Sequence, residues 1–225
     1  MNKLQSLCII TIFVTITGFS QSKSPLYLDA SQPVELRLED LMDRMTLEEK
    51  VYQMNQFVGL DHMRQAEKNL TEEELHSNDA QGFYKGLFSD DVAQMTKEGK
   101  IGSFLHVLTT EEANLLQELA LQSPLKIPIL IGIDAIHGNA LVSGTTVYPS
   151  PITLASTWSD SFLYDVGKQS AKEMRATGSH WAFTPNIDVL RDPRWGRVGE
   201  TFGEDPYMVG NMGARCTPIH HLSRY

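Results

Sequence analysis

Residues 127–133 read Ile-Pro-Ile-Leu-Ile-Gly-Ile, and this run decides the fold class of the chain. A short, continuous apolar run is typical of a parallel strand that is covered on both faces. Two further runs, at 101–108 and 181–189, also have the character of strands. A segment with helical signals follows each of the three runs. Strands that alternate with helices in this way predict parallel βα units.

The expected helices have recognisable starting points. Thr109 can cap the first of them through Glu112, and Ser159 can open the second. Pro206 is expected to start the third, because proline is well tolerated at the first position of a helix. The fold class is therefore α/β with about three βα units. Three parallel strands can begin either a doubly wound sheet or a closed barrel, and periodicity alone leaves both open.

Helices are also expected ahead of the first strand. Apolar side chains in residues 38–45 recur at helical spacing. Thr46 and Glu49 form a capping box that opens a second helix, and the apolar stripe of that helix is expected to reach Phe57. Residues 59–89 are charged and irregular, and we expect them to form an exposed insertion that carries a short helix.

Composition excludes one broad class of function. The chain has 225 residues, with 19 basic and 28 acidic side chains and a formal net charge of −9. A nucleic-acid-binding protein normally needs a basic face, so no nucleic acid is expected as a partner. Hydrophobic residues make up 41% of the chain, which is ordinary for a soluble globular protein. Two cysteines cannot form a disulfide scaffold.

Residues 1–20 have the three-part pattern of a secretory signal peptide, with a basic start, an apolar stretch and a polar exit. The apolar stretch is shorter than the roughly 20 residues of a transmembrane helix, so a retained membrane anchor is the less favoured alternative. We expect no stable membrane insertion after cleavage, and a periplasmic or secreted protein. Residues 21–33 are polar, contain two prolines and are interpreted as a linker.

Asp134 directly follows the apolar run of residues 127–133. In parallel α/β folds, working residues lie at the carboxyl ends of strands. A carboxylate at this place can accept two hydrogen bonds, for example from neighbouring sugar hydroxyls. The alternative is a carboxylate that only caps a helix or stabilises a turn.

The segment 191–206 follows the third predicted strand and holds three arginines, four acids and Trp195. Arginine offers a rigid fork of donors that suits hydroxyls or carboxylates, and an aromatic ring offers a flat face to a sugar ring. The alternative is an internal network of salt bridges that stiffens a long loop. On the residues alone, the two interpretations are evenly balanced.

Signals for metals and cofactors are weak. His137 lies three residues after Asp134, but no third and fourth ligand stand at a sensible spacing, so no metal site is expected. The pair His220 and His221 has no supporting carboxylate or cysteine motif and is interpreted as a solvated tail. Neither a glycine-rich phosphate loop nor a nucleophile elbow is present, and no cofactor is expected.

Taken together, five motifs resemble the N-terminal domain of family-3 glycoside hydrolases of the bacterial periplasmic β-glucosidase type. The resemblance covers about residues 34–214, and its five motifs occur in the same order and spacing. These are MTLEEKV at 45–51, IGIDAIHG at 131–138, FTPNIDV at 183–189, DPRWGR at 192–197 and ETFGEDP at 200–206.

This resemblance implies the first part of a (β/α)8 TIM-like barrel and the retaining hydrolysis of terminal β-D-glucosyl residues. Such hydrolysis uses two carboxylates about 5 Å apart, one as nucleophile and one as acid/base. It also implies that Asp134 and Arg197 bind the sugar of the first subsite, with a β-glucoside or oligosaccharide as substrate. Glu200 is then a supporting partner of the arginines. Neither sugar and linkage preference nor oligomeric state follows from these residues.

After about Ala214 the chain departs from the family pattern, and residues 215–225 form a divergent tail in which Pro218 would interrupt a helix. The segments that supply the family's nucleophile and acid/base are not found in this sequence. We therefore expect a truncated portion of the enzyme, inactive by itself. The alternatives are a non-catalytic carbohydrate-binding remnant, one half of a split enzyme, and a shift of substrate towards xylosides or N-acetylglucosaminides.

Overall fold

A computed structural model describes residues 24–75, 84 and 86–217, and the predicted signal peptide and the His220–His221 pair lie outside them. The chain divides into two compact units, Met1–Met45 and Thr46–Tyr225. Among the helices described, none is long and apolar enough to cross a membrane.

The first unit contains a 3-10 turn, η1 (Leu26–Leu28), and the helix α1 (Val34–Arg44). The backbone N–H of Tyr27 donates to Asp40 Oδ2 at 3.1 Å, and Arg37 Nε donates to the carbonyl oxygen of Tyr27 at 2.9 Å. Tyr27 is buried. The described part of the predicted linker is therefore attached to the helix that follows it.

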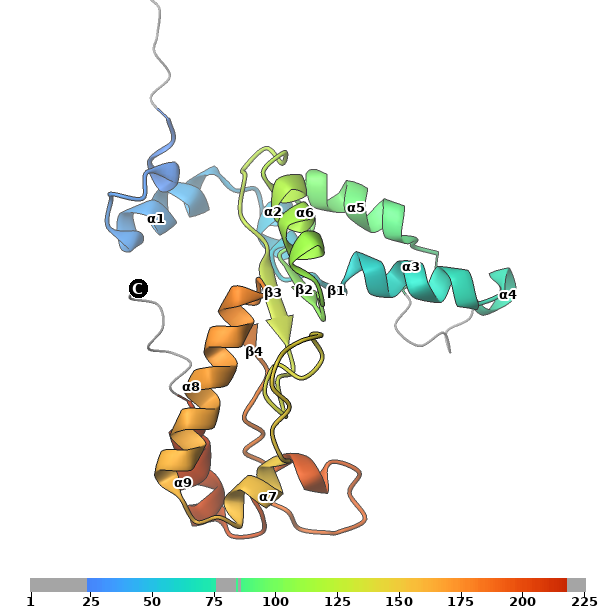
Figure 1. Cartoon of the computed structure of the whole chain (residues 1–225). Coiled ribbons are helices and arrows are strands. Elements are labelled where there is room, and N and C mark those ends of the chain that lie inside the picture. The colour runs from blue at the N-terminus through green and yellow to red at the C-terminus, as the bar shows by residue number, and fades with distance from the viewer. Residues whose placement is uncertain (1–23, 76–83, 85, 218–225) are drawn as a thin grey trace, which may run out of the picture. The chain divides into compact units, whose positions relative to one another are not determined.

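The second unit contains a sheet of four strands, β1 (Gln56–Val58), β2 (Ser103–Leu105), β3 (Leu130–Ile133) and β4 (Trp181–Ala182). All neighbouring pairs are parallel, and the strands lie in chain order β1-β2-β3-β4 (Figure 1). A doubly wound sheet reverses direction at a switch point, whereas a barrel adds each strand beside the previous one. The α/β prediction is confirmed, and the strand order is that of a barrel.

The position of Phe57 corrects the sequence prediction. The helix opened by Thr46 is α2 (Leu47–Tyr52), and it ends before Phe57, which lies in β1. Phe57 pairs in register with Phe104 of β2 and packs against Tyr84, with ring centroids 4.5 Å apart. The ladder to β2 and this burial outweigh the helical spacing, so the described sheet has four strands where three were predicted.

Residues 59–75 and 86–97 are more ordered than the predicted exposed insertion. They form α3 (Leu60–Asn69), α4 (Glu72–Leu75) and α5 (Ser89–Lys97), and α3 lies beside α5 (Figure 1). Leu60 and Met63 are completely buried in the main hydrophobic core. The segment therefore contributes to the core although its composition is charged.

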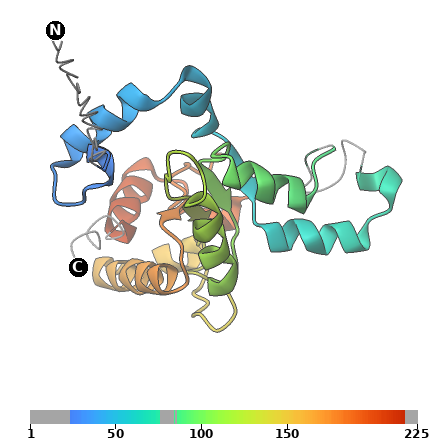
Figure 2. The same cartoon turned by 90° about the horizontal axis from the view of Figure 1, so that it is seen from above.

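The predicted helix starts at Thr46, Thr109 and Ser159 are confirmed. In each case the side-chain oxygen accepts the backbone N–H three residues later. The helices concerned are α2, α6 (Thr110–Ala120) and α8 (Asp160–Ala176), and a short α7 (Pro151–Ala155) precedes α8. The last helix, α9 (Pro206–Cys216), starts at the predicted proline and extends two residues into the predicted divergent tail. Figure 2 shows α8 and α9 side by side.

The third predicted strand is much shorter than expected. Only Trp181 and Ala182 pair with β3, and one further bond follows, in which Phe183 N donates to the carbonyl oxygen of Ile133 at 3.0 Å. Among the described residues, no strand pairs with the other edge of β4. A strand needs hydrogen bonds to a neighbouring strand to stay regular, so residues 184–189 continue as a loop beyond the carboxyl end of β4.

Candidate functional site

The carboxyl ends of the parallel strands bring His106, Asp134 and Phe183 to one edge of the sheet. His106 directly follows β2, Asp134 directly follows β3, and Phe183 follows β4. Figure 1 shows β3 pointing towards the loops that follow β3 and β4. This placement is the one expected for working residues in a parallel α/β fold.

Asp134 is bound by a histidine. Its Oδ2 lies 2.9 Å from Nε2 of His106, and 41% of the Asp134 side chain is exposed. The next helix, α7, begins only at Pro151, so Asp134 does not cap a helix. The carboxylate is therefore held at a strand end and remains open to solvent.

Glu200 anchors Arg197 in the loop after β4. Glu200 Oε2 accepts from Nε of Arg197 at 2.7 Å and from its Nη2 at 2.6 Å. The same oxygen accepts from Nδ2 of Asn186 at 2.8 Å. Glu200 thus joins the two ends of this loop, and the predicted supporting role of Glu200 agrees with its contacts.

Asp134 and Arg197 are brought together electrostatically. The pKa of Arg197 is raised, first by its hydrogen bond to Glu200 and then by the charge of that carboxylate. The negative charges of Asp134 and Asp188 also raise the pKa of Arg197. The two predicted sugar-binding residues, 63 positions apart in the sequence, therefore interact electrostatically.

Two residues of the segment 191–206 form an internal salt bridge, which is the kind of contact that the alternative interpretation of this segment predicts. Arg194 Nε donates to Asp192 Oδ1 at 3.0 Å, and this contact lowers the pKa of the Asp192 carboxyl. Beside this pair lies an open hollow of about 220 Å³. It is lined by Asp188, Val189, Arg191, Asp192 and Trp195. The loop thus combines a stiffening ion pair with an aromatic wall.

His137 has a structural contact. Its Nδ1 lies 3.2 Å from the carbonyl oxygen of Tyr148, which connects the two ends of the loop after β3. Among the residues that the structure describes, no group of three histidine, cysteine or acidic side chains could hold a metal ion.

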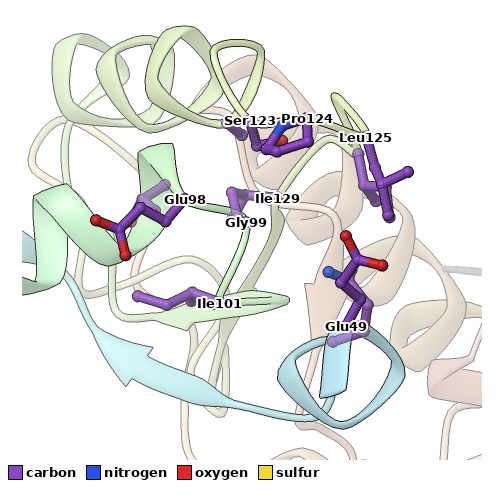
Figure 3. A pocket seen from close by; sticks show the side chains of 12 residues that line it. Glu49, Glu98, Gly99, Ile101, Ser123, Pro124, Leu125 and Ile129 are labelled. Atoms are coloured by element: carbon purple, nitrogen blue, oxygen red, sulfur yellow. The ribbon is translucent and has the colours of Figure 1, made fainter. Parts of the chain in front are cut away.

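A second pocket lies at the opposite, amino end of the strands. Ile101 precedes β2, Ile129 precedes β3, and both line it with Glu49 of α2 and Glu98 at the end of α5 (Figure 3). Its volume is about 10 Å³, which is at most the space of one water molecule. This pocket cannot accept a sugar, and the carboxyl-end cluster is the candidate site.

Sequence reasoning missed His106 as a site residue. It lies inside the apolar run 101–108, all of which was interpreted as strand, whereas β2 ends at Leu105. His106 adopts a left-handed backbone with φ of 57°, which ends the strand. The signal that could have identified His106 is its place as a polar residue near the carboxyl end of the predicted strand 101–108.

Comparisons with known proteins identify the family of the chain. Residues 46–218 match the glycosyl hydrolase family 3 N terminal domain. The chain is 31% identical over 176 residues to the periplasmic beta-glucosidase of Salmonella typhimurium, covering 77% of this chain and 19% of that protein. It is 38% identical over 121 residues to a beta-xylosidase of Formosa agariphila, covering 51% of this chain and 17% of that protein.

A solved structure gives the same result for the fold. The β-glucosidase from Listeria innocua in complex with glucose matches with a TM-score of 0.63 and 28% sequence identity, covering 84% of this chain and 24% of that one. The chain thus spans less than a quarter of the length of these three relatives. Its four parallel strands correspond to part of a TIM-like barrel. On the match over residues 46–218, the chain belongs to glycosyl hydrolase family 3.

Proposed function

We propose that this chain supplies part of the sugar-binding subsite of a β-glucosidase-type glycoside hydrolase, with Asp134 and Arg197 binding the terminal sugar. The observation that carries the proposal is the Asp134 carboxylate at the carboxyl end of β3, which is held by His106 and is still 41% exposed. The names of the relatives support a β-linked glucosyl substrate, and the beta-xylosidase relative supports a xylosyl residue as the second candidate.

The chemistry of the two side chains suits a sugar. An ionised carboxylate is an acceptor only, so Asp134 accepts from hydroxyl groups, whereas the guanidinium of Arg197 donates to them. About half of the Arg197 side chain is exposed even though Glu200 binds it. Donor and acceptor can therefore engage one polar ligand from two sides, and Trp195 of the neighbouring hollow offers an apolar face.

Hydrolysis itself needs more than these residues. Retention requires two carboxylates about 5 Å apart that act as nucleophile and acid/base. Three carboxylates at this end of the sheet are already engaged, Asp134 by His106, Glu200 by Arg197 and Asp192 by Arg194. We assign nucleophile and acid/base to none of the described residues, and we expect the 225-residue chain to lack hydrolytic activity by itself. An exported location is part of the same proposal.

A binding experiment tests the sugar subsite. Methyl β-D-glucoside is titrated into the 15N-labelled chain and followed by amide chemical shifts, which report millimolar affinities. We expect Asp134→Ala to weaken binding by about tenfold or more, since a buried or oriented charged acceptor contributes about 1.5–3 kcal/mol. Asp165→Ala, at an exposed position of α8, is the matched control and should bind as the wild-type chain does. Equal affinity of all three chains would remove Asp134 from the site.

The same titration with methyl β-D-xyloside separates the two candidate sugars, because the xyloside lacks the hydroxymethyl group of glucose. Tighter binding of the glucoside supports the glucosidase assignment, and tighter binding of the xyloside replaces it by a xylosidase assignment. Release of nitrophenol from an aryl β-glucoside measures turnover, and turnover by the purified chain would refute the expected lack of hydrolytic activity.

A further inference from the structure

His106 is placed by the sheet and not by a flexible loop. In the β2–β3 ladder Leu105 stands opposite Gly132, and the backbone N–H of His106 donates to the carbonyl oxygen of Gly132 at 3.0 Å. On its other side, a Cβ added to Gly59 would lie 2.8 Å from the carbonyl oxygen of His106. The peptide units of His106 are therefore confined between two glycines.

The backbone of His106 is held in an uncommon conformation. Its φ of 57° lies in the left-handed region, which only a few per cent of non-glycine residues adopt, most often asparagine, aspartate and histidine. Such conformations persist where surrounding contacts impose them, and they gather at functional sites. Here the imposed conformation accompanies a ring position at which Nε2 lies 2.9 Å from Asp134 Oδ2.

The contact also specifies the protonation of the ring. An ionised carboxylate has no proton to donate, so Nε2 of His106 must carry the hydrogen of this bond. The bond engages Oδ2, whereas Oδ1 has no hydrogen-bond partner among the described residues. One carboxylate oxygen is thus oriented by the protein, and the other remains available to a ligand.

We propose that His106 is the positioning residue of Asp134: its Nε2–H holds the carboxylate in the orientation that presents Oδ1 to a sugar hydroxyl. This inference rests on the proposed sugar subsite and adds to it the residue that orients its acceptor. Both side chains are partly buried, with 26% of the histidine and 41% of the aspartate exposed. The pair acts as one acceptor unit across β2 and β3.

Two substitutions separate the hydrogen bond from the backbone effect. His106→Asn suits the left-handed backbone, because asparagine tolerates positive φ, but its amide is too short to reach the place of Nε2. His106→Gln is long enough to put an N–H there. We expect H106N to weaken binding of methyl β-D-glucoside by about tenfold. H106Q should restore most of the lost affinity. His62→Asn, at an exposed position of α3, is the matched control.

The 15N spectrum of the imidazole rings reports directly which nitrogen of His106 carries the hydrogen of this bond. We expect the Nε2–H form of His106 in the wild-type chain, and a shift of this signal in Asp134→Ala. Thermal unfolding of each variant is recorded in parallel, and binding is compared at temperatures where each chain is folded.

The outcomes distinguish the two proposals. Binding that depends on Asp134 but is equal in the wild-type chain and H106N would overturn the positioning role alone. An Nδ1–H form of His106 would overturn it as well, because Nε2 would then have no hydrogen to donate. Failure of the wild-type chain to bind either sugar would overturn the sugar subsite, and with it the positioning role.

Discussion

The Glu112 carboxylate of α6 caps the first turn of α3, accepting the backbone N–H of Asp61 at 2.9 Å. The residue at the cap position of α3 is Gly59, which has no side chain to do this. A Cβ there would lie 2.8 Å from the carbonyl oxygen of His106. Because the carbonyl of His106 lies so close to residue 59, no side chain at that position can cap α3. Glu112, which is 51 residues from Asp61 in the sequence, supplies the cap instead.

The pH dependence of stability tests this contact. Burial raises the pKa of Glu112 above its ordinary value of 4.5. The stabilisation by Glu112 is therefore fully present at pH values below its pKa in the unfolded chain. It is lost as the pH rises through its pKa in the folded chain. Glu112→Gln keeps an acceptor and does not titrate. The free energy of unfolding of E112Q minus that of the wild-type chain should increase from about pH 4 to about pH 7. Urea unfolding measures it.

Glu111→Gln is the control for this experiment, because Glu111 lies in the same first turn of α6 but is exposed. Its difference from the wild-type chain should show a smaller slope with pH. Parallel slopes for the two variants would contradict a special role of the buried carboxylate.

His180 should act in the opposite pH direction. Its Nδ1 accepts the backbone N–H of Ile131 at 3.3 Å, and partial desolvation of the ring, followed by the charge of Arg175, lowers its pKa from 6.5. The neutral ring is favoured in the fold, so its contribution is present above pH 6.5 and is lost as pH falls through the folded pKa. His180→Asn keeps an acceptor oxygen and should lose less stability than the wild-type chain between about pH 7 and pH 5.

Thermal unfolding across this pH range measures the effect of His180. His62→Asn, at an exposed position of α3, should follow the wild-type curve. A wild-type chain that gains stability relative to H180N on acidification would show the assigned direction to be wrong.

Glu200 should support sugar binding through Arg197. Glu200→Gln removes the charge that pairs with the guanidinium at 2.6 Å, and charge-assisted bonds are about twice as strong as neutral ones. If Arg197 binds the sugar, E200Q should weaken binding of methyl β-D-glucoside by about fivefold. Glu204→Gln changes an exposed acid of the same loop and is the matched control. Equal affinity of the two variants would argue that Arg197 is oriented without Glu200.

Two glycines offer a direct contrast in packing. A Cβ at Gly102 would lie 2.0 Å from the carbonyl oxygen of Gln53, and this neighbour is backbone, which cannot move aside at low cost. Gly102→Ala should therefore lower the free energy of unfolding by about 1–3 kcal/mol. Gly210 lies in α9 with open space around its Cα, and Gly210→Ala should raise the free energy by about 0.5–1 kcal/mol through helix propensity. Urea unfolding of both variants checks the two signs.

The helix starts at Thr46, Thr109 and Ser159 could be predicted because a cap depends on residues three positions apart. Phe57 could not, since its helical spacing is satisfied locally while its burial depends on β2 and Tyr84. The same limit applies to β4. Its apolar run extends to residue 189, but only two residues have a neighbouring strand to pair with in the described chain.

The candidate site divides in the same way. The position of Asp134 at a strand end could be predicted because it ends an apolar run, and Arg197 was proposed from the motif that holds it. His106 became visible only in three dimensions, because its partner is 28 residues away on the next strand. The link from Arg197 to Asp134 likewise depends on a loop whose ends are joined by Glu200 and Asn186.

By itself, the sequence determined the class of the fold, the helix starts and one carboxylate at a strand end, because all of these are encoded in the order of nearby residues. The tertiary structure decided the strand order, the fourth strand and the pairing of His106 with Asp134. The physical reason is that parallel strands exchange hydrogen bonds only with strands distant in the chain. Which strand ends lie side by side, and therefore which side chains form one acceptor, is set by that pairing.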